Sequence, residues 1–191
     1  MTRKPSPKSM LCRLMGVVVL CMGHGFGANA QDRGVYDILL GAVPVGVFAF
    51  SGVEAQGRYS LAGQIRTSGL VGALTNVRYD AKAQGRRIGD RFVPTLYEEQ
   101  ATVGDRKTDL SITYQSGVPN PPVFVPPRQT DRPDVDPADQ AGTLDLLTAL
   151  FVLFRDTPAD MLCSFSAPIY DGARRTSIAL RFLRQSGDEI I

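Results

Sequence analysis

In the body of the chain, hydrophobic residues are densest in the stretch TLDLLTALFVLFR, at residues 143–155. At about 100° per residue, its leucines and phenylalanines cover more than half of the circumference of a helix. A surface helix needs a narrower apolar stripe, and a helix that spans a bilayer needs about 20 apolar residues. The pattern predicts a core helix at about 143–155 that is covered on most sides. The alternative is an amphipathic helix that binds a partner.

The residues around this stretch are of the types that begin and end helices. Thr143 or Asp145 can accept hydrogen bonds from the backbone N–H groups of the first turn. Arg155 suits the negative end of the helix dipole, and Pro158 cannot continue the helix. These residues support the predicted bounds.

Most of the remaining sequence alternates between apolar and polar residues, which is typical of strands. Strands are predicted at residues 35–40, 45–53, 58–67, 77–83, 91–100, 106–114, 161–167, 169–171 and 174–183. Turns are predicted at 85–89 and at Gly104-Asp105, and residues 68–74 form either a helical turn or a glycine-bent corner. The strand with Phe48 and Phe50 is apolar on both faces, which favours a strand covered on both sides or a barrel wall.

Residues 117–137 contain seven prolines and are predicted to be an extended connection into the helix. Short strands with close turns favour an antiparallel meander, and such a sheet needs an element to cover its apolar face. The predicted fold is mainly β, a curved antiparallel sheet or incomplete barrel wrapped around one buried α-helix. Residues 31–191 are predicted to form this single β-rich domain.

The N-terminus has the pattern of a secretory signal peptide, predicted at residues 1–30. A basic segment precedes nine apolar residues at 14–22, and Ala28-Asn29-Ala30 offers a cleavage site before Gln31. An uncleaved anchor is the alternative, although the apolar segment is short for a membrane span. Lipidation at Cys21 is disfavoured because Leu20 precedes it. The predicted location is the periplasm, and no transmembrane segment is expected in the processed chain.

Cleavage would change both the charge and the chemistry of the chain. The whole sequence has 21 basic and 19 acidic residues. Loss of the four bases of the signal leaves 17 basic residues and a net charge of −2, which does not favour nucleic-acid binding. The only histidine, His24, would also leave, and so would Cys12 and Cys21. This excludes His-based triads and His- or Cys-based zinc sites, and we expect no metal and no cofactor.

Cys163 would then be the only cysteine. In an oxidising compartment, it is either a buried inert thiol or one half of a pair whose partner is missing from this chain.

Several stretches in order along the chain resemble the domain of unknown function 3108 family of exported bacterial proteins. The quoted stretches are YDILLG at 36–41, RTSGLV at 66–71, TLDLLTAL at 143–150, Cys163, and YDGARR at 170–175. The resemblance spans about residues 35–184 and implies the cell envelope of Gram-negative bacteria, with no catalytic residues to carry over. Family members usually continue with a segment that often holds a second cysteine, so a missing C-terminal portion would explain the odd Cys163.

Other candidate chemistry is weak. Asp171-Gly172 with Arg174-Arg175 is either an anion-binding hairpin or an ordinary turn. Glu98 and Glu99 point to opposite faces of a strand, so they are a poor acid–base pair and are expected to be solvated. The aspartates of 131–139 lack the spacing of a calcium loop.

We therefore expect a non-enzymatic periplasmic domain that binds an apolar ligand such as lipid or an acyl chain. The predicted cavity lining is Phe48, Phe50, Leu147, Leu150, Phe151 and Phe154. The alternative is a cell-envelope module that docks a protein through a sheet edge or the proline-rich loop. A third possibility is an enzyme that uses only carboxylates, for which no motif argues.

Overall fold

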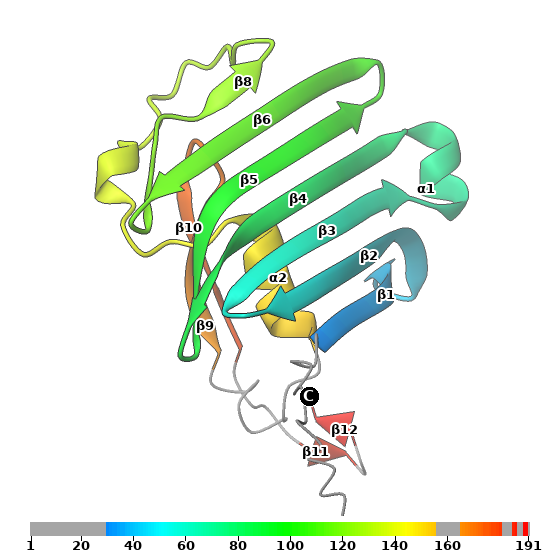
Figure 1. Ribbon diagram of the computed structural model, residues 1–191. Coiled ribbons are helices and arrows are strands. Elements are labelled where there is room, and N and C mark those ends of the chain that lie inside the picture. Colours follow the sequence, from blue (N-terminus) through cyan, green and yellow to red (C-terminus); the bar gives the residue numbers. More distant parts are fainter. Residues whose placement is uncertain (1–29, 156–164, 181–184, 187–188, 191) are drawn as a thin grey trace, which may run out of the picture.

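The computed structural model describes residues 30–155, 165–180, 185–186 and 189–190 (Figure 1). The predicted signal peptide, Pro158, Cys163 and the predicted strand start at 161–164 lie outside the described residues. Most of the chain forms strands, in the order β1 (Ala30–Leu40), β2 (Val43–Ala55), β3 (Arg58–Thr67), helix α1 (Gly69–Leu74), β4 (Val77–Ile88), β5 (Arg91–Val103) and β6 (Arg106–Gln115). Then follow β7 (Val118–Pro119), β8 (Val123–Val125), the 3-10 helix η1 (Pro137–Asp139), α2 (Leu146–Phe154), β9 (Ser166–Tyr170), β10 (Arg175–Ala179), β11 (Gln185–Ser186) and β12 (Glu189–Ile190).

The main element is an antiparallel sheet of eight strands, in which β1 to β6 are neighbours in chain order. Both β7 and β8 pair with β6. The mainly β class and the antiparallel meander are confirmed. The predicted incomplete barrel is wrong, because the sheet is neither closed nor strongly curled. Helix α2 lies against one face of the sheet, which we call the inner face, together with the β9–β10 hairpin (Figure 1). The sheet covers α2 from one side and does not wrap around it.

The alternation and turn residues of the sequence predicted the positions of most elements, but some observed ends differ from the predicted ones. The observed β3 has the predicted bounds, and residues 68–74 contain the helical alternative, α1. Strand β4 runs to Ile88, through residues that were predicted to form a turn. Gly85 is within the strand at a register irregularity between β4 and β5. A Cβ there would collide with the Tyr59 hydroxyl, so the glycine serves side-chain packing and the turn comes later, around Gly89.

Alternation determines which side chains are buried. Leu110, Ile112 and Tyr114 of β6 are buried, as their spacing predicts. In β2 only one face is buried. Phe48 and Phe50 are in the core, whereas Val53 on the other face is exposed. The outer face of β2 is half-buried from Val45 to Ser51 and exposed at Val53. Neither of the two expected environments, cover on both sides or a barrel wall, is therefore found.

Glycines let α2 lie close to the sheet. A Cβ on Gly52 would collide with the ring of Phe151, and a Cβ on Gly63 would collide with Leu147. Both large side chains are buried. Burial of each such side chain contributes roughly 1.5–3 kcal/mol, which makes α2 a major stabiliser of the fold. The helix has nine residues within the predicted range of 143–155.

The proline-rich segment is part of the sheet rather than a free arm. Its strand β8 places Phe124 against the core and opposite Leu110. Farther along, Leu144 bridges to Ile169 of β9, so the chain enters α2 beside the β9–β10 hairpin. No helix within the described residues is long and apolar enough to cross a membrane.

Candidate functional site

A cavity of about 520 Å³ lies between the inner face of the sheet and helix α2. We call it the inner cavity. Its apolar walls are Phe48, Ile65, Tyr79, Ala81, Tyr97, Leu110, Phe124, Leu146, Leu147, Leu150 and Ala173. Ligand pockets usually have volumes of about 300–1,000 Å³ and mostly apolar walls with a few polar groups. The inner cavity has both properties.

The register of the sheet explains why space remains here. One row across β3, β4 and β5 consists of Gly63, Ala81 and Glu99, which are directly opposite one another. The neighbouring row across β2, β3 and β4 consists of Phe48, Ile65 and Tyr79. Gly63 and Ala81 are small, and beside a row of large residues they leave a hollow in the inner face, although Leu147 fills the space directly above Gly63. Helix α2 then covers the hollow with side chains of its first two turns.

The structure divides the six predicted lining residues into two groups. Phe48, Leu147 and Leu150 line the inner cavity. Phe50, Phe151 and Phe154 are in an aromatic cluster beside it and are absent from its lining.

The aromatic cluster is closely packed. The ring centroids of Phe50 and Phe151 are 5.8 Å apart, and those of Phe48 and Phe154 are 5.7 Å apart. These separations suit favourable aromatic pairs. Phe48 therefore belongs to both groups and joins the cluster to the cavity wall.

Four charged side chains that the sequence did not single out for this site also line the inner cavity: Glu99, Arg128, Asp171 and Arg174. Glu99 is half-buried on the inner face and accepts a hydrogen bond of 2.5 Å from the Tyr97 hydroxyl. Arg128 lies over the Phe124 ring, 5.2 Å from its centroid, and pairs with Asp134 at 3.3 Å. Arg174 comes from the β9–β10 turn. The cavity thus combines apolar walls with two carboxylates, those of Glu99 and Asp171, and two guanidinium groups.

Two weaker candidates from the sequence now have structural explanations. Glu98 and Glu99 do point to opposite faces, but Glu99 faces the cavity rather than solvent. Asp171 accepts hydrogen bonds from the backbone N–H groups of Ala173 and Arg174, at 2.8 and 2.7 Å. Its carboxylate holds the turn in shape, as in an Asx-turn, and this favours the ordinary-turn interpretation.

A buried polar group lies at the start of α2. The Asp145 carboxylate is completely buried and caps the helix by accepting 2.7 Å hydrogen bonds from the Thr148 backbone N–H and hydroxyl. The Tyr59 hydroxyl is 3.2 Å from the Thr148 hydroxyl. Burial raises the pKa of Asp145 to about 6, although the hydrogen bonds from Thr148 oppose the shift. Burial also raises the pKa of Tyr59, with a further contribution from Asp145.

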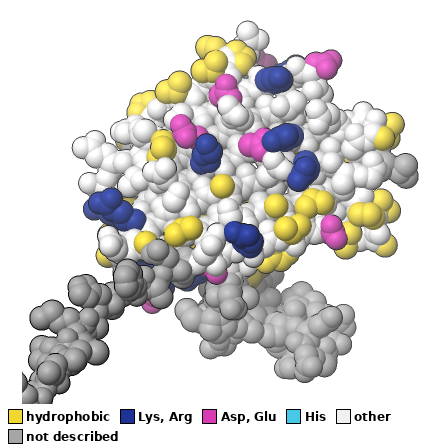
Figure 2. Space-filling model, turned by 45° about the vertical axis from the view of Figure 1, so that its right-hand side comes forward, with side chains coloured by type: hydrophobic (Ala, Val, Ile, Leu, Met, Phe, Trp, Pro, Cys, Tyr) yellow, Lys and Arg dark blue, Asp and Glu magenta, His cyan; other side chains and the backbone are white. Residues whose placement is uncertain are grey.

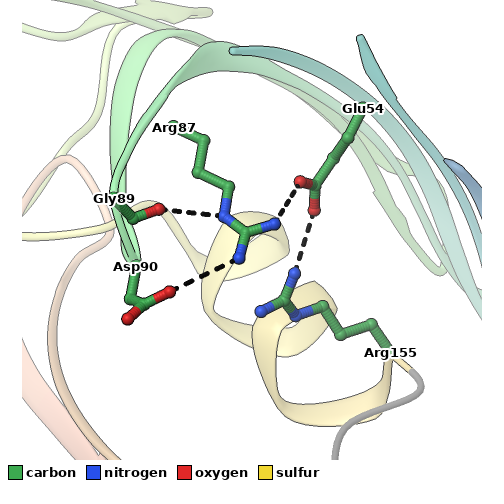
Figure 3. A network of polar contacts seen from close by, with 5 residues as sticks. All are labelled: Glu54, Arg87, Gly89, Asp90 and Arg155. Atoms are coloured by element: carbon green, nitrogen blue, oxygen red, sulfur yellow. Dashed lines mark hydrogen bonds and ion pairs between the residues drawn. The ribbon is translucent and has the colours of Figure 1, made fainter. Parts of the chain in front are cut away.

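An ion-pair network fastens the other end of α2 to the sheet (Figure 3). The Glu54 carboxylate accepts hydrogen bonds from Arg155 at 3.0 Å and from Arg87 at 2.9 Å. Arg87 also donates to the Gly89 carbonyl at 3.1 Å and lies 3.5 Å from Asp90. The network links β2, the β4–β5 turn and the helix end, and we interpret it as structural.

The outer face of the sheet differs from the inner one. It has a hollow of about 640 Å³ whose charged lining residues include Arg33, Asp80, Lys82, Glu98 and Asp109. The molecular face in Figure 2 shows basic and acidic side chains interspersed among apolar ones. Such a mixed, exposed surface is ordinary for a soluble domain. Within the part of the chain that the structure describes, no three metal-ligating side chains gather in one place.

A family model described as "Protein of unknown function (DUF3108)" matches residues 35–187. The match covers more than half of the chain, so the protein belongs to this family. The resemblance inferred from the motifs is therefore confirmed. No curated protein matches the chain. No solved structure matches it either.

Proposed function

We propose that the protein is a non-enzymatic periplasmic domain that binds an acyl chain or a similar apolar ligand in the inner cavity. The observation that carries this proposal is the inner cavity between α2 and the sheet at Gly63 and Ala81, whose volume and apolar walls suit such a ligand. Glu99, Arg128 and Arg174 would contact its polar end. The N-terminal pattern supports export, which N-terminal sequencing of the periplasmic protein tests, with Gln31 as the expected first residue.

The binding test uses a series of fatty acids of increasing length, titrated against a displaceable fluorescent probe. Burial of one methylene contributes about 0.8 kcal/mol, so affinity should rise roughly fourfold per methylene until the cavity is full. Native mass spectrometry of the protein purified from the periplasm should show a co-purified lipid. A protein that carries no lipid and binds no fatty acid of any length would contradict the proposal.

A matched pair of variants locates the ligand. Ala81→Phe places a ring in the inner cavity and should abolish binding. Ala62→Phe makes the same change on the exposed outer face of the neighbouring strand and should leave affinity unchanged. Circular dichroism checks that both variants fold. Equal effects of the two substitutions would show that the ligand, if bound, does not occupy the inner cavity.

The alternative function is a cell-envelope module that docks a protein. Val123 and Val125 favour it, because they are exposed by 60% and 56% on the outer side of the short strand β8. Deletion of the whole proline-rich segment would remove two strands, so the test replaces both valines with lysine. Affinity capture from the periplasm that depends on these valines, together with an empty inner cavity, would favour docking over ligand binding.

A further inference from the structure

The two edges of the main sheet differ in how they are protected. One edge has the short strands β7 and β8, with prolines within and around them. Short strands and prolines discourage pairing with another chain. The other edge is β1, which has eleven residues and no proline. Among the described residues, β1 pairs with β2 only, and its other side offers N–H and C=O groups to a further strand.

Strand β1 is held in place by its inner face. The Tyr36 hydroxyl donates to the Phe154 carbonyl at 3.1 Å, and the two rings are 4.7 Å apart. The outer face of the strand is exposed and carries Arg33, Val35 and Asp37 at alternate positions, with Val35 exposed by 73%. Neither Arg33 nor Asp37 takes part in an ion pair between described residues. The strand thus presents a cation and an anion at equal distances on either side of the apolar Val35.

We propose that β1 pairs antiparallel with β1 of a second copy of this chain, about a two-fold axis through Val35. Such an axis is perpendicular to the sheet and keeps both outer faces on one side. The two sheets then form one continuous sheet, and Val35 is opposite its own copy. Arg33 of each chain is directly opposite Asp37 of the other, so two ion pairs flank the axis.

Charge selects this register among the neighbouring ones. Residues directly opposite each other in an antiparallel pair have side chains on the same face of the sheet. The two-fold axis must therefore lie between one residue and its own copy, because side chains alternate along a strand. An axis through Gly34 would place Arg33 opposite Val35, and an axis through Tyr36 would place it opposite Leu39. Only the axis through Val35 brings the opposite charges together. Residue 35 also lies at the middle of β1, whether the strand is counted from Ala30 or from Gln31, the expected first residue of the processed chain.

The geometry also sets the strength of this association. The register between β1 and β2 shifts between Ile38 and Leu39, so regular pairing is expected for residues 32–38. One pair of edge strands is expected to bury less surface than a stable specific interface, which buries about 1,200–2,000 Å² in total. The dimer is therefore concentration-dependent and dissociates on dilution. Both inner cavities lie on the same side of the joined sheet, away from the contact between the two β1 strands.

Sedimentation velocity over a wide concentration series tests the proposal. The chain is expressed with its own N-terminal segment, residues 1–30. Arg33→Asp replaces both attractive pairs with repulsive ones and should weaken the dimer roughly ten- to hundredfold. Arg33→Asp with Asp37→Arg exchanges the charges and should restore it. Arg106→Asp makes the same charge change at an exposed position of β6 and should leave association unchanged.

A cross-link tests the register directly. Opposed Cα atoms of antiparallel strands are about 4.5–5.5 Å apart, which is within disulfide range. In a chain whose own cysteines are replaced by serine, Val35→Cys should form a disulfide-linked dimer on mild oxidation. Val53→Cys, exposed on β2, should not.

Three results would overturn the proposal. They are a monomer at every concentration, a dimer that Arg33→Asp leaves unchanged, and a dimer that the charge exchange fails to restore.

Discussion

The Asp145 carboxylate offers a decisive test of how burial and hydrogen bonding compete in this fold. It is completely buried at the start of α2, where it caps the helix through Thr148. Burial disfavours the charged form, whereas the cap hydrogen bonds favour it. The raised pKa of about 6 means that burial outweighs the cap. Asp145→Asn keeps the size of the side chain and a good capping group, but removes the titration.

The size and sign of the effect follow from this shift. An unperturbed aspartate has a pKa of about 3.9, so the folded state holds this proton about two pH units longer than the unfolded state does. Between pH 4 and 6 the folded state binds more protons, and its stability therefore falls as pH rises. The contribution is complete below about pH 4 and is lost above about pH 6. At 1.36 kcal/mol per pKa unit it amounts to about 3 kcal/mol.

Denaturant unfolding of the wild type and of Asp145→Asn, from pH 4 to pH 7.5, measures this contribution. The difference in free energy of unfolding between the two proteins should shift by about 3 kcal/mol towards the variant as pH rises. Groups common to both proteins cancel in this difference, including Asp80, whose pKa the hydrogen bond from Arg78 lowers. A difference that is constant with pH, or that shifts towards the wild type, would refute the reasoning and show that the cap outweighs burial.

Two further predictions concern packing and charge. Gly63→Val should cost at least about 1–3 kcal/mol in free energy of unfolding, because its Cβ would collide with Leu147. Thermal unfolding measures this, and an unchanged melting temperature would show that α2 does not pack against this glycine. Glu54→Gln should cost roughly 1.5–3 kcal/mol, because it weakens the charge-assisted hydrogen bonds from Arg87 and Arg155. Adding Arg155→Met should recover part of that loss; an additive loss in chemical denaturation would contradict the network.

Local patterns predicted the parts of the fold that depend on neighbours in sequence. The clean alternation in residues 58–67 gave the bounds of β3, and Gly104-Asp105 gave the hairpin between β5 and β6. The apolar density at 143–155 located α2, and Asp145 was among the predicted caps. These features follow from side-chain periodicity and from backbone groups that short polar residues satisfy locally.

The same patterns failed where the neighbour comes from a distant part of the chain. Gly85 has the appearance of a turn residue, but it lies inside β4 because the Tyr59 ring needs the space. Glu99 looked solvated, yet the register places it in the row with Gly63 and Ala81, facing the inner cavity. Phe151 was predicted to line a cavity, but it packs on Gly52. Only cross-strand register decides such neighbours.

The sequence by itself determined the mainly β class, the antiparallel order of the strands, the apolar helix and the family, because each depends on residue types and on their spacing along the chain. Tertiary structure alone decided that the sheet stays open, that α2 lies on one face, and that a hollow remains above the row of Gly63 and Ala81. The physical reason is that a cavity is the volume that side chains from several strands leave unfilled. The pairing register sets that volume, and no single segment of the sequence contains it.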